Sequence, residues 1–232
     1  NRRIWMQDLK LDITSPILIF GMSAPRFVPK EIDIVEFLAH AVEHNEFGTK
    51  MQLLVRPHPQ NVQGGMADAS WLIRLKAIES QRVHIFYPKI VQGGLPWSME
   101  MDDMNTLSAA LCESIVCINS CSTLSLDALM AGTGNIAPLF DGASPLPYWT
   151  SSARLKDFPH IRKFIELGGT ELAPDFDSLT TLIKKYQTDR NWNQAKRENA
   201  QNKECGYADG QSTQRVVNTL SRILQLRSEF IN

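Results

Sequence analysis

Two short polar turns carry the chemistry that this sequence offers most clearly. The first is Arg-Pro-His-Pro at residues 56–59, here called the RPHP turn, and it closes an apolar stretch. Its prolines fix φ and restrict the residues before them, so we expect His58 on a stiff support from which its ring can donate to a phosphate oxygen. Arg56 is expected either to add charge there or to pair with a carboxylate of the sheet. From local spacing alone, a purely structural hydrogen bond by His58 explains this turn equally well.

The second is Asn-Ser-Cys-Ser-Thr at residues 119–123, here called the NSCST turn, which joins an apolar stretch to an amphipathic one. Ser122 or Thr123 at the start of a helix would leave backbone N–H groups free, and the helix dipole favours an anion there. Their hydroxyl groups would add donors to a bound phosphate. A serine that simply caps its helix is the alternative for this turn taken alone.

The elements that must position these turns follow from hydrophobic periodicity, because short apolar stretches alternate with longer amphipathic ones. The predicted strands are residues 16–21, 51–55, 83–87, 114–118 and 135–140. The predicted helices between them are residues 32–42, 68–80, 102–112 and 122–131, with Gly132 as a C-cap. The strands are apolar without alternation, which is typical of a parallel sheet covered on both faces. The predicted fold is therefore α/β, a Rossmann-like doubly wound sheet.

The rest of the chain is expected to complete one domain. Residues 1–15 are a lead-in, residues 16–175 the Rossmann-like domain, and residues 176–232 C-terminal helices packed on that domain. Later helices are predicted at residues 160–167, 176–186, 192–203 and 213–230, with a short strand at 170–173. Residues 141–159 form an ordered loop, and Pro138 suits an edge or a strand end.

In an open parallel sheet, ligands bind outside the carboxyl ends of the strands. The sequence puts four polar turns at such ends: residues 21–23 with Ser23, the RPHP turn, residues 87–89, and the NSCST turn. Four turns on one rim would form a crevice. Trp97, Tyr148 and Trp149 are expected in loops near it, where they would either stack on a base or sugar or staple those loops to the domain.

The order of these motifs resembles the donor-binding C-terminal half of GT-B glycosyltransferases. More narrowly it is similar to bacterial Kdo transferases, to sialyltransferases with HP and Ser/Thr motifs, and to CDP-glycerol glycerophosphotransferases of surface polysaccharide synthesis. The resemblance rests on LLVRPHP at 53–59, INSCSTLSLDALMAG at 118–132 and YADGQSTQRVVNTL at 207–220. Asn119-Ser120-Cys121 departs from the aspartate and aromatic residue of the glycerophosphotransferases, which puts glycerol phosphate transfer in doubt.

The resemblance implies a set of substrate-binding residues. His58 would contact the donor phosphate with help from Ser122 and Thr123, and Ser120 would lie close by. Glu100 is the nearest candidate for the glutamate that holds the ribose, although Asp102 and Asp103 compete and fit equally well as acids at a helix start. The full expected set is His58, Arg56, Ser120, Ser122, Thr123, Ser23 and Glu100.

The resemblance also implies a donor and partners. The expected donor is a nucleotide-activated sugar, with a CMP-linked acid sugar ahead of others, and no metal or other cofactor is implied. The acceptor and the catalytic base would lie on an N-terminal domain outside this chain, so the chain alone would bind donor without transferring it. A non-hydrolysing sugar-nucleotide epimerase half, or a non-catalytic Rossmann-like interaction module, are the alternatives.

Charge, cysteine content and hydropathy bear on nucleic-acid binding, on the cellular compartment and on membrane insertion. Lys and Arg total 24 against 25 Asp and Glu, a formal net charge of −1, which gives no footprint for nucleic acid. Four cysteines without a metal or disulfide pattern suit a reducing cytoplasm, and no stretch approaches the roughly 18 apolar residues of a membrane span. The mildly basic stretch at residues 184–203 is interpreted as a solvated helical face, with peripheral contact with an inner membrane as the alternative.

Overall fold

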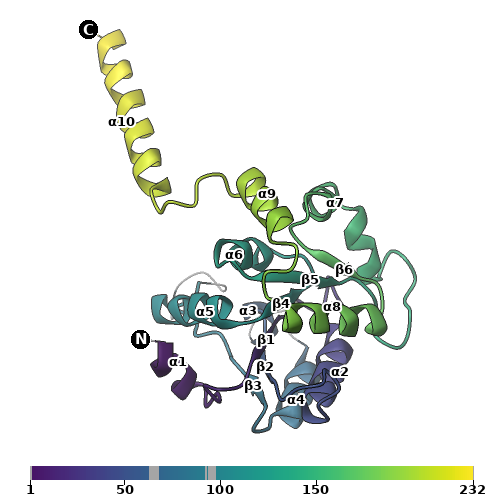
Figure 1. Cartoon of the computed structure of the whole chain (residues 1–232). Coiled ribbons are helices and arrows are strands. Elements are labelled where there is room, and N and C mark those ends of the chain that lie inside the picture. The colour runs from purple at the N-terminus through teal and green to yellow at the C-terminus, as the bar shows by residue number, and fades with distance from the viewer. Residues whose placement is uncertain (1, 63–67, 92, 94–97, 232) are drawn as a thin grey trace.

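The computed structural model describes residues 2–62, 68–91, 93 and 98–231. Its centre is a six-stranded sheet in the order β3-β2-β1-β4-β5-β6, in which every neighbouring pair is parallel (Figure 1). The strands are β1 (Ile17–Gly21), β2 (Gln52–Arg56), β3 (Val83–Ile85), β4 (Val116–Asn119), β5 (Gly134–Pro138) and β6 (Glu171–Ala173). The five predicted strands and the short sixth one are confirmed. Pro138 ends β5, which lies inside the sheet, so of the two expected positions the strand end is observed.

Helices cover both faces of this sheet, as expected for a doubly wound fold (Figure 1). They are α1 (Arg2–Asp8), α2 (Glu31–Glu43), α3 (Pro59–Val62), α4 (Ala69–Ile78), α5 (Met101–Glu113) and α6 (Leu124–Met130). Successive residues of a strand point to opposite faces. Leu18 and Phe20 of β1 therefore enter the core under α2, α4 and α8 (Phe176–Thr188), while Ile17 and Ile19 enter the core under α1, α5 and α6.

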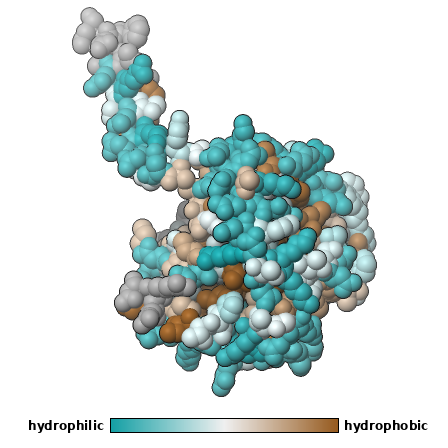
Figure 2. Space-filling model, viewed as in Figure 1, coloured by the Kyte–Doolittle hydropathy of each residue, from teal (hydrophilic) through white to brown (hydrophobic). Residues whose placement is uncertain are grey.

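After β5 the chain continues through η1 (Ser152–Asp157), α7 (Pro159–Glu166), α8 (Phe176–Thr188), α9 (Gln194–Glu204) and α10 (Ser212–Ile231). Helix α8 packs into the main core, and α9 contacts α6. Helix α10 projects away from this body (Figure 1), and Figure 2 shows apolar and hydrophilic side chains side by side on it. Its apolar face, with Val216, Leu220 and Ile223, is exposed.

Two parts of the chain differ from what periodicity predicts. Residues 1–15 are expected as a lead-in, yet α1 forms there because Trp5, Met6 and Leu11 bury against the α5 side of the sheet. In α5 the inward-facing position is taken by Asp103, whereas the apolar Met104 is exposed. Asp103 can turn inward because a buried arginine meets it there.

The loop after β5 is ordered by one carboxylate. Asp141 accepts hydrogen bonds from the Ser151 hydroxyl (2.5 Å) and from the backbone N–H groups of Ser152 (2.8 Å) and Leu146 (3.1 Å). Tyr148 stacks edge-on against Trp149, whose side chain is 81% exposed. Trp149 therefore does not staple the loop to the domain. Trp97 lies outside the described residues.

Candidate functional site

The two polar turns, more than 60 residues apart in the sequence, line one crevice. It has a volume of about 480 Å³ and lies at the carboxyl ends of β1, β2 and β4. The RPHP turn forms one wall, and Ser122 and Thr123 of the NSCST turn form another, with Gly21 and Met22 between them. The sequence expectation that both turns meet at one rim of a parallel sheet is thus confirmed.

His58 is held in one tautomer within this crevice. The backbone N–H of Gln60 donates to its Nδ1 at 3.1 Å, so the ring proton of the neutral imidazole sits on Nε2. Burial, together with the charge of Arg56, lowers the pKa of His58 below its usual 6.5, so the ring is neutral at pH 7. Its Nε2–H has no acceptor among the described residues and is available as a neutral donor to a ligand oxygen.

Arg56 is a buried structural residue of the crevice wall. Its guanidinium binds both carboxylate oxygens of Asp103, with Nη1 at 2.9 Å from Oδ1, and lies 4.2 Å from the centre of the Phe86 ring. Of the two roles expected for Arg56, pairing with a carboxylate is therefore the observed one, and the carboxylate comes from α5 rather than from the sheet. The pair fixes the RPHP turn against α5.

The NSCST turn is closed mainly by its own hydrogen bonds. Asn119 Oδ1 accepts from the Ser122 N–H (3.0 Å) and from the Ser125 hydroxyl (2.7 Å), and the Leu124 N–H donates to Ser122 Oγ at 3.3 Å. The expectation of several free N–H groups is wrong, because the Asn119 side chain and the Ser122 hydroxyl take them. The Thr123 N–H keeps no acceptor among the described residues, and the Ser122 and Thr123 hydroxyls line the crevice.

Three other expected binding residues lie outside the crevice lining. Ser23 and Ser120 are hydrogen-bonded to each other through their hydroxyl groups, and Ser120 is buried. Glu100 precedes α5 with an exposed side chain that caps nothing. Their direct contact with a donor stays a prediction from the resemblance.

The sequence did not indicate Asp127, and it offered Asp103 only as a competitor of Glu100 or as an acid at a helix start. Asp127 of α6 lines the crevice, burial raises the pKa of its carboxyl group, and that carboxyl group has no hydrogen-bond partner in the described part of the chain. Asp103 is the partner of Arg56. A signal for Asp103 was available, because it lies four and seven residues before Leu107 and Ala110 on the apolar face of its helix.

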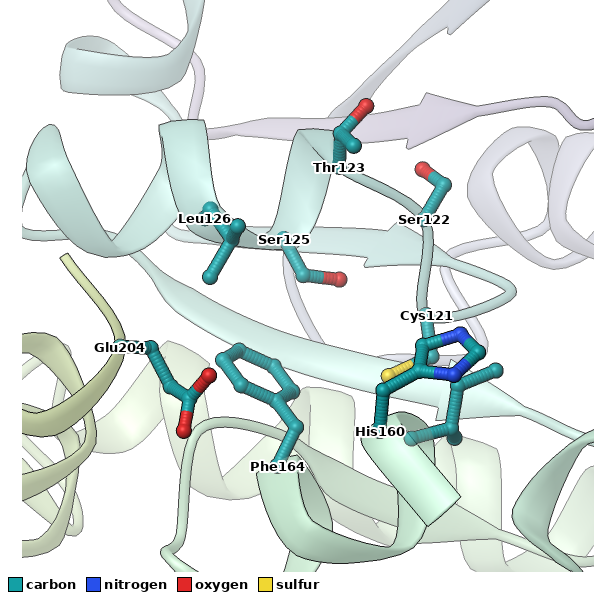
Figure 3. Close-up of a pocket in the computed structure, with 9 residues that line it drawn as sticks. Cys121, Ser122, Thr123, Ser125, Leu126, His160, Phe164 and Glu204 are labelled. Atoms are coloured by element: carbon teal, nitrogen blue, oxygen red, sulfur yellow. The ribbon is translucent and has the colours of Figure 1, made fainter. Parts of the chain in front are cut away.

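A second, smaller cavity of about 230 Å³ lies on the other side of the NSCST turn, between α6, α7 and α9 (Figure 3). In Figure 3 the hydroxyls of Ser122 and Thr123 point away from Phe164 and Glu204. Burial raises the pKa of the Cys121 thiol to about 12, so no thiolate forms there at neutral pH. Glu204 is paired with Lys163 at 2.7 Å. The hydroxyls are therefore better placed for a ligand in the crevice than for one in this cavity.

Within the described residues, no three His, Cys, Asp or Glu side chains converge as metal ligands would. His40 and His44, four residues apart on α2, stack on each other with ring centres 4.0 Å apart. His40 also contacts Glu46 at 3.1 Å, and both rings are exposed.

Gly21 allows the close approach of α6 to the end of β1, and a Gly21→Ala variant tests it. An added Cβ would lie 2.0 Å from Leu124 Cδ2, so Leu124 must leave its position at the crevice. Moving the end of one partly buried side chain off its rotamer costs about 0.5–1.5 kcal/mol, and urea unfolding should show that loss. The double variant Gly21→Ala/Leu124→Ala should recover part of it. An undiminished unfolding free energy for Gly21→Ala would contradict this packing.

The parallel sheet, its order and the crevice at the strand ends define the class of this chain: a Rossmann-like domain of the kind found in GT-B folds. Two solved structures share that fold at a TM-score of 0.56. One is the wall teichoic acid polymerase TagF, with 12% identity over 97% of this chain. The other is a complex of S. aureus MnaA with UDP, with 10% identity over 96% of this chain.

A structure described as a UDP-N-acetylglucosamine 2-epimerase from Listeria monocytogenes also matches, with a TM-score of 0.53 and 13% identity over 96% of this chain. This chain spans 48–49% of the length of these three structures. No protein-family model matches the sequence, and no curated protein sequence shows significant similarity to it.

Proposed function

We propose that this chain is the donor-binding half of a glycosyltransferase that builds a bacterial surface polysaccharide, such as a capsule or an O-antigen. The observation that carries the proposal is the crevice itself. It brings a neutral His58 Nε2–H donor and the hydroxyls of Ser122 and Thr123 together at the strand ends where ligands of open parallel sheets bind. The ligand is a nucleotide-activated sugar, whose phosphate oxygens accept from these donors.

One more polar group of the crevice fits another part of the same ligand. Asp127 is exposed at the crevice, and its carboxyl group has no hydrogen-bond partner among the described residues. A carboxylate repels phosphate oxygens but accepts hydrogen bonds from hydroxyl groups. We assign Asp127 to the ribose hydroxyls, a role for which the resemblance offered Glu100.

The finer choice of donor follows from the resemblance, which favours a CMP-linked acid sugar of the Kdo or sialic acid type. The matched MnaA structure holds UDP, which adds a uridine nucleotide as the main competitor. The acceptor and the general base are proposed to lie on a second Rossmann-like domain, since this chain covers about half of its matched structures. On this proposal the 232-residue chain alone binds donor and does not turn it over.

A second candidate function is one half of a non-hydrolysing sugar-nucleotide epimerase. The observation in its favour is the match to the Listeria structure described as a UDP-N-acetylglucosamine 2-epimerase. An epimerase needs acid and base groups in the cleft. Asp127 is a candidate for one of these groups, because its carboxylate lines the crevice and has no hydrogen-bond partner among the described residues. His58 is not a candidate for the base, because Gln60 occupies its Nδ1 and its Nε2 carries the proton.

A thermal-shift panel with CMP, CDP, UDP, GDP and NAD distinguishes these candidate functions. A ligand at 100 times its dissociation constant stabilises the fold by about 2.7 kcal/mol, which moves the melting midpoint by several degrees. A cytidine-selective shift supports the favoured donor, and a uridine-selective shift moves weight to the epimerase or to a UDP-sugar transferase. No shift with any nucleotide contradicts the proposal and supports the non-catalytic interaction module.

The proposed location is the cytoplasm, with peripheral contact with the inner membrane as a weaker suggestion. Among the described residues, no helix is long and apolar enough to cross a membrane. The basic stretch at residues 184–203 gives little support to membrane contact, because several of its cations are engaged within the protein. Arg197 is buried and donates to the Gly132 carbonyl at 2.8 Å, and Lys185 lies 4.8 Å from the centre of the Trp192 ring.

A further inference from the structure

A cluster of four polar residues lies behind the crevice and is not used by the proposed ligand contacts. It consists of Ser23, Glu31, Asn61 and Ser120, here called the polar cluster. Glu31 and Asn61 are fully buried, and Ser120 is nearly so. Glu31 begins α2 on the same helix face as Val35 and Leu38, where periodicity calls for an apolar residue. Burying a carboxyl group in that position costs free energy unless other groups form hydrogen bonds with it.

The hydrogen bonds of the cluster join the three loops that form the crevice. Glu31 Oε2 accepts from the Ser23 N–H at 2.6 Å, which holds the loop after β1. The Ser23 hydroxyl bonds the Ser120 hydroxyl, inside the NSCST turn. Asn61 Nδ2 donates to the Ser23 carbonyl at 3.1 Å, and the Asn61 N–H donates to the His58 carbonyl at 2.7 Å, which attaches the RPHP turn.

Two acceptor atoms of the cluster are left over. Glu31 Oε1 and Asn61 Oδ1 are both buried, and neither has a hydrogen-bond partner among the described residues. An ionised Glu31 could satisfy neither atom, because a carboxylate only accepts hydrogen bonds, whereas a protonated one brings a donor to the cluster. Burial raises the pKa of Glu31 to about 8, against opposing hydrogen bonds from the Ser23 N–H and the Ser120 hydroxyl.

We propose that Glu31 is a positioning residue that, as a neutral acid, locks the β1 loop, the RPHP turn and the NSCST turn into the geometry that receives the ligand. Its consequence for binding rests on the proposed function, whereas its structural part does not. Glu31 touches no ligand in this role. It acts through Ser23, Ser120 and Asn61, and ionisation of Glu31 would place a buried charge at the junction of all three loops.

Other titratable and charged groups lie on the elements around Glu31, but none of them accounts for its ionisation near pH 8. These groups are Lys30 at the N-cap of α2, Asp33 of α2, Arg56 of β2, His58, Arg74 of α4, Cys121 and Asp141. Burial and hydrogen bonds, not the charge of any of them, account for the pKa of Glu31. His58 titrates below its usual 6.5 and Cys121 near 12, so neither changes charge around pH 8.

The structural part can be tested without any ligand, by two-dimensional ¹H–¹⁵N NMR of the whole chain from pH 6 to 9.5. The Ser23 amide donates directly to Glu31, so its chemical shift should titrate with a midpoint near pH 8. In Glu31→Gln, which keeps the shape of the neutral acid, that transition should be absent. A wild-type Ser23 amide that shows no transition between pH 7 and 9, or an unchanged transition in Glu31→Gln, would overturn the proposal.

Thermal unfolding gives an independent check with a defined sign. The ordinary pKa of Glu is 4.5 and the folded value about 8, so between these pH values the unfolded chain loses the proton first and the folded state becomes less stable as pH rises. The melting midpoint of Glu31→Gln minus that of wild type should therefore increase from pH 5 to 8 and then level off. Glu36→Gln, a control on the same helix whose partner is Arg74, should show no such rise. A flat difference for Glu31→Gln counts against the proposal.

The binding part uses the nucleotide that gives the largest thermal shift with wild type. Glu31→Gln should keep its affinity and lose the decrease that wild type shows above pH 8, while Glu31→Ala should bind roughly 3- to 30-fold more weakly. Equal affinities for all three proteins at pH 7 and 9.5 would refute the positioning role. If no nucleotide binds wild type, the proposed function fails, and the NMR and unfolding results still decide whether Glu31 locks the loops as a neutral acid.

Discussion

A His58→Ala variant should bind a nucleotide donor roughly 10- to 100-fold more weakly than wild type, because a hydrogen bond to a charged group contributes about 1.5–3 kcal/mol. The neutral Nε2–H of His58 is the donor that the crevice offers, and Gln60 holds the ring in that tautomer. Isothermal titration calorimetry with the nucleotide that shifts the melting point most would measure the loss.

Two further substitutions sharpen this test. Glutamine places an amide N–H near the position of Nε2, whereas asparagine places it near Nδ1. His58→Gln should therefore retain more affinity than His58→Asn. His160→Ala is the matched control, because His160 is exposed and lines the second cavity beyond the NSCST turn (Figure 3). Loss of binding in His160→Ala with His58→Ala unaffected would move the ligand to that cavity.

An Asp103→Ala variant should lose about 3–5 kcal/mol of unfolding free energy, because removing one partner leaves the other buried charge uncompensated. The Arg56 guanidinium is almost fully buried, and both of its contacts with Asp103 are short and direct. Asp103 also accepts from the Lys89 N–H at 2.9 Å, which fixes the chain after β3. Urea unfolding monitored by far-ultraviolet circular dichroism would measure the effect.

The neighbouring residue provides the control for this prediction. Asp102 is 80% exposed and pairs with Lys89 only at 3.5 Å, so Asp102→Ala should change stability by less than about 0.5 kcal/mol. The double variant Arg56→Met/Asp103→Leu removes both charges and should be more stable than Asp103→Ala. A cost below about 1 kcal/mol for Asp103→Ala would mean that the ion pair does not hold the crevice wall.

Hydrophobic periodicity, proline and glycine predict much of the fold, because each acts on residues that are close together in the sequence. The apolar stretches at 16–21 and 114–118 become β1 and β4, buried on both faces, since a parallel sheet covered by helices requires this. The RPHP turn ends β2 where its prolines predict, and Gly132, at φ +74°, closes α6. The crevice could also be expected, because the carboxyl ends of parallel strands share one rim.

The sequence does not predict which residues form hydrogen bonds and ion pairs with the crevice residues. Arg56 and Asp103 are 47 residues apart, and Ser23 and Ser120 are 97 apart. Which of them meet depends on the sheet order, in which β1 lies between β2 and β4, and on the registers that bring Gly21 beside Arg56 and Asn119. In this structure Arg56 pairs with Asp103 in the crevice wall, and Ser23 and Ser120 bond to each other outside the crevice lining, so the contact of these residues with a donor stays a prediction.

For Glu31 and Asp103, the sequence predicts burial but not the hydrogen-bond or ion-pair partner. Each is an acidic residue on the apolar face of its helix, a pattern visible in the sequence. The pattern indicates that a carboxyl group is buried but not what meets it: Asp103 finds a cation and Glu31 finds hydroxyl and amide groups.

By itself, the sequence determined the strands, the helices between them and the two polar turns, but not α1, because periodicity and proline act over a few residues. Only the tertiary structure decided that His58, Ser122 and Thr123 share a crevice with Asp127, and that the Asn119 side chain accepts from the Ser122 N–H of its own turn. The reason is geometric. Hydrogen bonds and ion pairs depend on distances of a few ångströms between segments that only the sheet order and register bring together.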